Sequence, residues 1–250
     1  MQQPITSLLI TASRKAVKFL HRDFLELEML QRSSKGNYDF CNKAYVKAQD
    51  LLHNELQQYT SALFFPEDKF EPDNACEMVL LINPLDGFSN LEKSLPFFAV
   101  SITCLKKINN ILTATCTVIN FPALDEIYYV EKGRGVWSEN NTANNSRLRV
   151  SGCASVDNFL ISADDFNINP VFLKNARVFG CHCYGMSLLA AGKIDAVYFS
   201  SLNYTLKAGF DLIVREAGGA IINNDRMFIA TNYELSKKFE HLLTEKHLLE

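Results

Sequence analysis

Residues 80–104, LLINPLDGFSNLEKSLPFFAVSITC, contain an apolar segment, a short polar turn and a second apolar segment. The apolar segments have the composition of β-strands, and the Pro, Asp, Gly, Ser and Asn between them are typical of a turn. We therefore expect Asp86 at the edge of a sheet, where its carboxylate could bind a cation that prefers oxygen ligands. Asn83 places an amide where a second carboxylate would complete the pair. The turn is thus either a working metal site or the remnant of one.

Two helices are predicted ahead of this turn. From residue 5 to about residue 30, apolar side chains recur at helical spacing, namely Ile5, Leu8, Leu9, Ala12, Ala16, Phe19 and Leu20. The segment SSKGNYDF, residues 33–40, is expected to break the helix. A second helical pattern follows through Ala44, Ala48, Leu51, Leu52, Leu56 and Tyr59. Both helices therefore precede any strand.

Strand patterns dominate the middle of the chain and predict an antiparallel meander. They are EMVLLI, FFAVSITCL, ILTATCTVI, EIYYVEKG and GVWSE, within residues 77–139. After a polar stretch near residues 138–150, short strands alternate with helices, which is typical of an α/β arrangement. The strands are FLISA, ARVFG, DAVYF and AIINN, and the helices are YGMSLLAAGKI and AGFDLIVREAGG.

Composition narrows the function classes. The 250 residues are 48% hydrophobic and carry a formal net charge of −3, so the basic excess of a nucleic-acid-binding chain is absent and no direct nucleic-acid ligand is expected. An apolar run of the roughly 20 residues that cross a bilayer is also absent, as is a signal-peptide pattern at the start. The 7 scattered cysteines fit reduced thiols, and we expect a cytoplasmic protein without membrane contact.

The order of the motifs resembles the inositol monophosphatase family, including its SuhB-like branch. The family signature D-P-[IL]-D-G-T-x-N-F, followed by P-x-x-x-V-S-I, reads here Asn83-Pro84-Leu85-Asp86-Gly87-Phe88-Ser89-Asn90-Leu91, then Pro96 and Val100-Ser101-Ile102. The segments KGNYDF, PED, GRGVW, LAAGKIDAVYF and LIVREAGGAI follow the family's order.

This resemblance implies an α/β fold, a layered α-β-α-β-α sandwich that forms one compact unit with a cleft between its halves. Residues 1–145 would form an α+β half with an antiparallel sheet, and residues 146–250 an α/β half with a mixed sheet. It also implies a homodimer. The family chemistry is Mg²⁺-dependent hydrolysis of a small phosphate monoester, in which metal ions orient a water and stabilise charge on the phosphate.

The family's site residues carry over position by position. Metal ligands would be Glu67 from the PED segment, Asn83, Asp86 and the backbone carbonyl of Leu85. The resemblance assigns Glu67 and Ser89 to orienting the attacking water. The substrate-binding positions would be Gly87, Phe88, Ser89, Cys181 and His182.

Several acids of the family are replaced. Asn83 brings no negative charge and cannot bridge two cations as a carboxylate can. The motif W-D-x-A-A-G reads Thr205 to Phe210, so that Leu206 stands at the metal-binding aspartate with Lys207 beside it. Tyr45 replaces an aspartate of the second helix, and Ser200 a glutamate that contacts substrate. We therefore expect Mg²⁺ binding to be weak or absent.

The segment Cys181-His182-Cys183 has two interpretations. A soft-metal cluster needs more ligands at wider spacing, so we expect small residues at a helix start, where Cys181 could still be a reactive thiol. For the whole chain two functions stay open. One is a binding or regulatory module whose phosphatase activity is weakened or lost, with a protein partner, for which the SuhB-like branch suggests the transcription machinery. The alternative is an active Mg²⁺-dependent inositol or sugar phosphate monoesterase with a reduced metal set.

Overall fold

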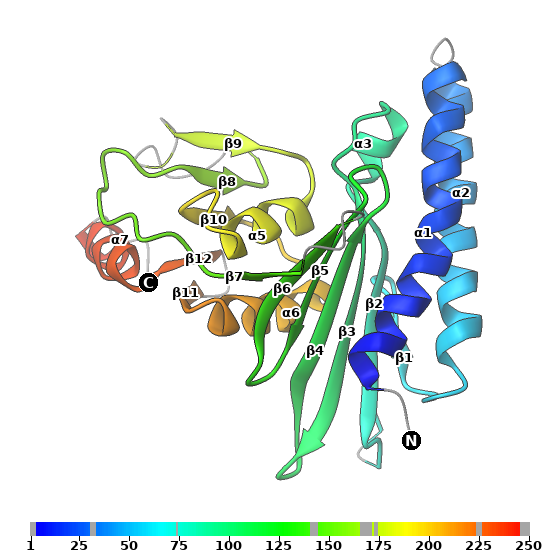
Figure 1. Ribbon diagram of the computed structural model, residues 1–250, viewed down its shortest axis with the longest axis horizontal. Coiled ribbons are helices and arrows are strands. Elements are labelled where there is room, and N and C mark those ends of the chain that lie inside the picture. The colour runs from blue at the N-terminus through cyan, green and yellow to red at the C-terminus, as the bar shows by residue number, and fades with distance from the viewer. Residues whose placement is uncertain are drawn as a thin grey trace.

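The protein folds into five layers, in the order helices, sheet, helices, sheet, helix (Figure 1). The computed structural model describes residues 4–30, 34–73, 75–140, 145–165, 172, 175–223 and 227–245. The predicted α/β sandwich is therefore confirmed. The two sheets divide between β7 and β8, whose bounds are given below, while the two predicted halves, 1–145 and 146–250, stay a prediction.

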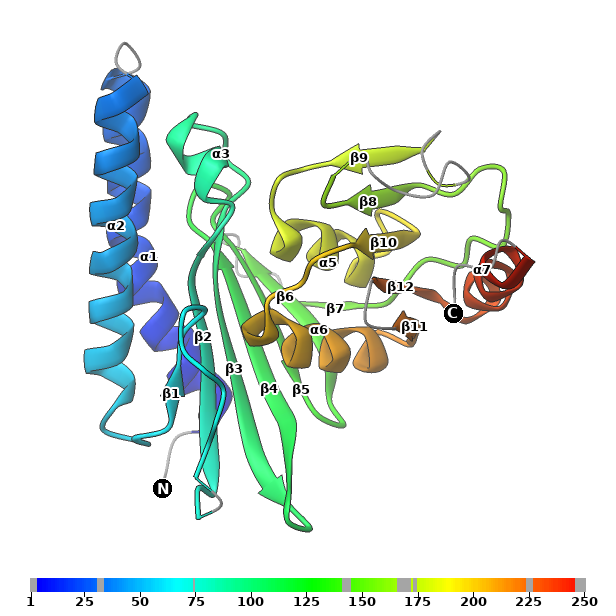
Figure 2. The same ribbon diagram turned by 180° about the vertical axis from the view of Figure 1, so that it is seen from behind.

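The outer helical layer consists of α1 (Ile5–Leu30) and α2 (Ser34–Leu56), which run side by side along one face of the first sheet (Figure 2). Their buried residues recur every three or four positions, which is the spacing of one helix face. They are Leu9, Ala12, Ala16, Leu20, Phe24 and Leu27 in α1, and Cys41, Ala44, Ala48, Leu52 and Leu56 in α2.

The prediction that residues 33–40 break the helix is wrong for residues 34–40, because α2 begins at Ser34. Contacts with the following α3 (Phe88–Glu92) stabilise this first stretch of α2. Asn37 donates a hydrogen bond to the carbonyl of Glu92, and the ring of Tyr38 packs edge-on against Phe88. Tertiary contacts therefore outweigh the local turn signal.

The first sheet has seven strands in the order β1 to β7. They are β1 (Leu63–Phe64), β2 (Met78–Asp86), β3 (Ala99–Ile108), β4 (Ile111–Phe121), β5 (Glu126–Glu131), β6 (Gly135–Asn140) and β7 (Ser146–Leu148). All neighbouring pairs are antiparallel except β1 and β2, which are parallel, so the predicted meander is confirmed from β2 onward. The register of β2 shifts between Asn83 and Asp86, and this irregularity shapes the turn.

The second sheet has five strands in the order β11-β12-β10-β8-β9 and is mixed, as predicted. Its strands are β8 (Ile161–Ala163), β9 (Ala176–Val178), β10 (Ala196–Phe199), β11 (Gly219–Asn223) and β12 (Phe228–Asn232). Helices α5 (His182–Ala190) and α6 (Tyr204–Glu216) lie between the sheets, and α7 (Tyr233–Glu245) covers the outer face (Figure 1). The sequence analysis did not predict β12 or α7.

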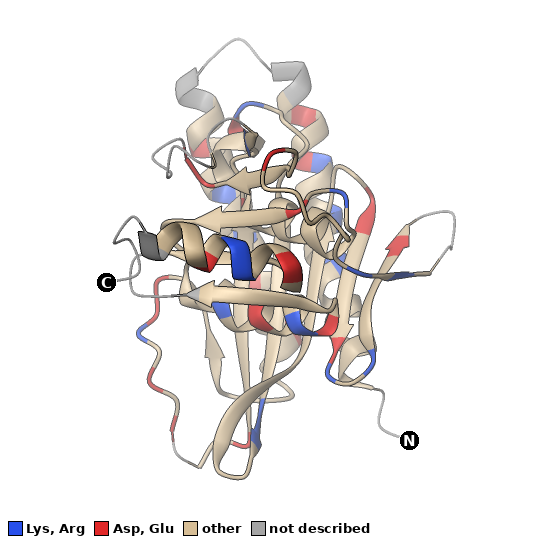
Figure 3. Cartoon of the chain, turned by 90° about the vertical axis from the view of Figure 1, so that its left-hand side faces the viewer, with Lys and Arg blue, Asp and Glu red and all other residues tan. Residues whose placement is uncertain are grey.

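In the cartoon of Figure 3, the positions of Lys and Arg and those of Asp and Glu are interspersed along the chain. No helix in the described part of the chain is long and apolar enough to cross a membrane.

Helix α6 approaches the first sheet most closely at Gly209. A Cβ atom there would lie 2.3 Å from Thr103 Oγ1, a side chain that is itself hydrogen-bonded to Thr117 at 3.1 Å. Only hydrogen on the Cα of residue 209 fits at this distance. Gly209 therefore fixes the spacing between α6 and strands β3 and β4.

Replacing Gly209 with Ala is expected to lower the free energy of unfolding by about 1–2 kcal/mol, because overpacking a tight contact outweighs the better helix propensity of Ala. Urea denaturation measures this difference. The control is Gly152→Ala, since nothing lies within 4 Å of an added Cβ there. Equal stabilities of the two variants would contradict the proposed close approach.

Candidate functional site

The centre of the candidate site is the carboxylate of Asp86, the last residue of β2, which is 8% exposed. Three donors at the start of α5 surround it. The backbone N–H of Cys183 donates to Oδ2 at 2.7 Å, the Cys181 thiol lies 3.2 Å from the same oxygen, and His182 Nδ1 lies 3.3 Å from Oδ1. Asp86 therefore caps the N-terminus of α5 from the end of a strand of the first sheet.

A second carboxylate lies on the other side of the imidazole of His182. Asp164 Oδ2 is 4.0 Å from His182 Nε2, and it accepts hydrogen bonds from Ser200 N, Ser200 Oγ and Ser201 N at 2.6, 2.9 and 3.0 Å. Asp164 follows β8 and the two serines follow β10, which pairs with β8 in parallel. The carboxyl ends of these strands therefore gather the polar groups.

The electrostatics of this group favour an ion pair between Asp86 and His182. Burial alone raises the pKa of Asp86, but the hydrogen bond and charge of His182, with the donors Cys183 and Cys181, lower it below its ordinary value. Burial lowers the pKa of His182, yet Asp86 and then Asp164 raise it above its ordinary value. The two carboxylates on either side of the imidazole thus favour its protonated form.

The Cys181 thiol is buried and does not have the reactive character considered from the sequence. Burial first, and then the negative charge of Asp86, raise its pKa well above the ordinary value. The same two causes raise the pKa of Cys183. Both residues therefore keep their protons, and Cys181 serves as a donor to Asp86 rather than as a thiolate.

Glu67 lies in the exposed loop after β1 and contacts a different partner. Its Oε1 accepts a hydrogen bond from the hydroxyl of Tyr45, the residue that stands at an aspartate position of the resembled family. Burial, followed by this hydrogen bond and the nearby charges of Glu67 and Asp68, raises the pKa of Tyr45. Tyr45 is therefore a neutral donor that occupies part of the Glu67 carboxylate.

Asn83 is engaged within the protein, and the side chains of Leu85 and Leu206 are buried in apolar clusters. Asn83 Oδ1 accepts a hydrogen bond from the backbone N–H of Leu85 at 3.2 Å. The side chain of Leu85 packs in the core beneath α1 and α2. Leu206, at the start of α6, is 2% exposed and belongs to the apolar cluster between the two sheets.

The predicted substrate-binding positions lie at the start of α3 and of α5. Gly87 has φ +87°, and a Cβ atom there would lie 2.5 Å from the carbonyl oxygen of Phe97, so a side chain would be excluded. Phe88 packs against Tyr38, and Ser89 is exposed. Asn90 donates to the carbonyls of Phe97 and Phe179 at 2.7 and 2.8 Å, which joins the turn to the segment before α5.

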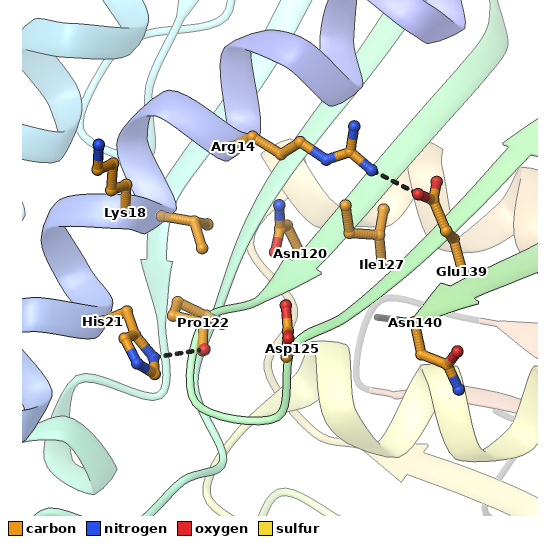
Figure 4. A pocket seen from close by; sticks show the side chains of 10 residues that line it. Arg14, Lys18, His21, Asn120, Pro122, Asp125, Ile127, Glu139 and Asn140 are labelled. Atoms are coloured by element: carbon orange, nitrogen blue, oxygen red, sulfur yellow. Dashed lines mark hydrogen bonds and ion pairs between the residues drawn. The ribbon is translucent and has the colours of Figure 1, made fainter. Parts of the chain in front are cut away.

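A polar pocket of about 390 Å³ lies between α1 and the ends of β4, β5 and β6 (Figure 4). Three of its polar side chains bind one another or the backbone. Arg14 pairs with Glu139 at 2.5 Å, and His21 Nδ1 lies 2.9 Å from the carbonyl of Pro122. A larger and more apolar pocket of about 600 Å³ lies beside α6 and is described further below.

Comparison with known proteins identifies the family. The profile of the inositol monophosphatase family matches residues 1–243. The chain belongs to the inositol monophosphatase family. It is 30% identical over 238 residues to the inositol-1-monophosphatase of Mesorhizobium japonicum, covering 88% of this chain and 86% of that protein. It is 25% identical over 234 residues to the Nus factor SuhB of Escherichia coli K12, covering 87% and 84%.

Solved structures give the same result for the fold. The extragenic suppressor protein SuhB of Bartonella henselae superposes with a TM-score of 0.79 at 25% identity, covering 98% of this chain and 100% of that one. The inositol monophosphatase of Anabaena superposes with a TM-score of 0.71 at 17% identity, covering 96% and 95%. The architecture expected for the inositol monophosphatase family is thus confirmed.

The structure brings Asp86, Cys181 and His182 together, and it adds Asp164, which the sequence analysis missed. Glu67 contacts Tyr45. The metal-binding roles of Glu67, Asn83, Leu85 and Asp86 stay predictions, as do the substrate-binding roles of residues 87–89, 181 and 182. A usable signal for Asp164 was its place directly after a strand of the α/β half.

Replacing Asp86 with Asn is expected to lower the free energy of unfolding by about 2–3 kcal/mol, because His182 and the donors of α5 lose a charged acceptor. The loss should be smaller in a His182→Ala background, and a double-mutant cycle by urea denaturation measures the coupling. Asp157→Asn, at an exposed position, is the control and should stay within about 0.5 kcal/mol. If Asp86→Asn left the free energy of unfolding unchanged, the anchoring role of this carboxylate would be refuted.

Proposed function

We propose that this member of the inositol monophosphatase family has weak or no Mg²⁺-dependent phosphatase activity and acts as a binding or regulatory module. The observation that carries the proposal is the environment of Asp86. Three protein donors occupy a carboxylate that family resemblance assigns to metal, and one of them is an imidazole whose pKa is raised. A cation bound at Asp86 would have to displace these donors.

The residues present do not fit a two-metal magnesium site. Mg²⁺ prefers near-octahedral oxygen ligands and gives up its waters reluctantly. Here Asn83 contributes an amide, Leu206 contributes no ligand atom, and Tyr45 donates a hydrogen bond to Glu67. In the part of the chain that the structure describes, no group of three or more His, Cys, Asp and Glu could hold a metal ion. These residues therefore do not support a catalytic step that depends on two magnesium ions.

The alternative function is an active Mg²⁺-dependent phosphatase for an inositol or sugar phosphate, with a reduced metal set. Two observations favour it: Glu67 and Asp86 keep their carboxylates, and the relative from Mesorhizobium japonicum bears the name inositol-1-monophosphatase. In this case a small phosphorylated metabolite would bind near the starts of α3 and α5, through residues 87–89, 181 and 182.

The module proposal includes a protein partner, supported by the name Nus factor SuhB of several relatives, which we extend to this chain as a proposed link to transcription. A cytoplasmic location and a homodimer belong to the same proposal. Light scattering measures the dimer as twice the chain mass of 28.3 kDa.

An assay of phosphate release separates the two functions. With myo-inositol 1-phosphate or p-nitrophenyl phosphate and Mg²⁺, kcat/KM should lie at least about 10²-fold below that of the Mesorhizobium japonicum relative assayed in parallel, since losing one electrostatic stabiliser has effects of this size. Thermal unfolding should show no saturable rise in Tm with millimolar Mg²⁺. Robust hydrolysis that a chelator abolishes would establish the alternative.

The double variant Asn83→Asp, His182→Ala is expected to gain a Mg²⁺-dependent rise in Tm. The His182 change releases Asp86 from the imidazole, and the Asn83 change supplies a second carboxylate nearby. Differential scanning fluorimetry across a Mg²⁺ series measures the rise, with His182→Ala alone as the control. A rise of the same size in the control would show that Asn83 is not the missing ligand.

A further inference from the structure

The pocket of about 600 Å³ beside α6 lies apart from the Asp86 site. One wall is a single stripe of α6, made by Tyr204, Lys207, Ala208, Asp211, Leu212 and Arg215. The floor is the face of the first sheet turned away from α1 and α2, with Leu81, Leu105 and residues 112–114 (Figure 2). The volume lies within the range of small-molecule sites, about 300–1,000 Å³.

A second wall of the pocket is aromatic. Phe70, from the loop after β1, packs against Phe64 and Tyr204 with ring centroids 5.1 and 5.5 Å apart. The hydroxyl of Tyr204 donates to the carbonyl of Phe65, which ties this loop to α6. The wall is therefore held in place from both sides, and a flat apolar body can stack against it.

The rim of the pocket is basic, although the whole chain carries a net charge of −3. Lys132, Lys207 and Arg215 line it against one acid, Asp211. Arg215 already pairs with Asp211 at 3.6 Å, and Lys207 makes interactions of its own. Among the described residues, Lys132 is the rim cation that forms no ion pair.

Lys132 is also held at the rim by the backbone around it. The carboxylate of Glu216, in the last turn of α6, accepts hydrogen bonds from the N–H groups of Gly133 and Gly135 at 2.7 and 2.9 Å. The backbone N–H of Lys132 donates to the carbonyl of Thr115. The β5–β6 turn is therefore fixed against α6, so the backbone at Lys132 is already ordered and only its side chain must become ordered when an anion binds.

We propose that this pocket binds a small amphipathic carboxylate, whose apolar body lies on the floor beside Phe70 and Tyr204 and whose carboxylate meets Lys132. The apolar lining favours a ligand with an apolar body, and the basic rim favours an anionic group. Lys132 matches a singly charged group such as a carboxylate. The site is independent of the Asp86 carboxylate and of the proposed loss of phosphatase activity.

The experiment titrates the full-length protein with 2-naphthoate, with 2-naphthylmethanol as a neutral analogue of the same shape, using calorimetry or ligand-observed NMR. We expect saturable binding of 2-naphthoate and weaker binding of the alcohol. Lys132→Glu should weaken 2-naphthoate about three- to tenfold, the size expected for a partly exposed charge contact that becomes repulsive, and leave the alcohol unchanged. Lys193→Glu, an exposed position outside the pocket, is the matched control.

Ala208→Phe provides a second arm, because a ring at this position would fill the pocket and should abolish binding of both compounds while circular dichroism stays native. Lys132 is exposed, so its variant tests the proposal even where Ala208→Phe does not fold. Absence of saturable binding, equal affinities for the acid and the alcohol, or equal effects of Lys132→Glu and Lys193→Glu would overturn the proposal.

Discussion

The contact on which the two halves of the candidate site depend is the buried carboxylate of Asp86 at the start of α5. Asp86 ends a strand of the first sheet, and its three donors belong to residues 181–183, at the start of the helix α5 that lies between the two sheets. A buried charge is stable only where donors or an opposite charge surround it. Asn90 adds a second tie between the same turn and Phe179, so the turn and α5 fix each other's position.

Much of the fold could be predicted because apolar periodicity reports burial directly. The stripes of α1 and α2 and the apolar runs of β2 to β6 are local patterns, and the structure confirms them. The start of α2 was mispredicted because contacts with α3 stabilise a segment whose own residues favour a turn. Helix α7 was readable in principle, since Leu235, Phe239 and Leu243 are buried at a spacing of four. Strand β12 is a short apolar run with no alternation, which carries little signal.

The candidate site was less predictable than the fold, because a motif gives residue identities without side-chain directions. The signature located Asp86 and the segment 181–183, yet it could not indicate that the carboxylate would cap α5 rather than face solvent. No local pattern indicated that Tyr45 would contact Glu67, 22 positions along the chain. Nor could it pair His182 with Asp164, because that proximity arises from the parallel pairing of β8 with β10.

The replaced residues are mutually consistent if the site has no metal, as proposed. Without a cation, an aspartate at position 206 would be an unpaired charge inside the apolar cluster that includes Phe199 and Phe210, which costs several kcal/mol. A leucine there instead gains about 1.5–3 kcal/mol from burial. Asn83 likewise removes a charge while its amide oxygen keeps a hydrogen bond to Leu85. Asp86 stays buried, and the neighbouring imidazole of His182 favours its ionised form. Loss of one metal ligand therefore favours loss of the others. Without the cation, the negative charge of each remaining buried acid would be left unpaired.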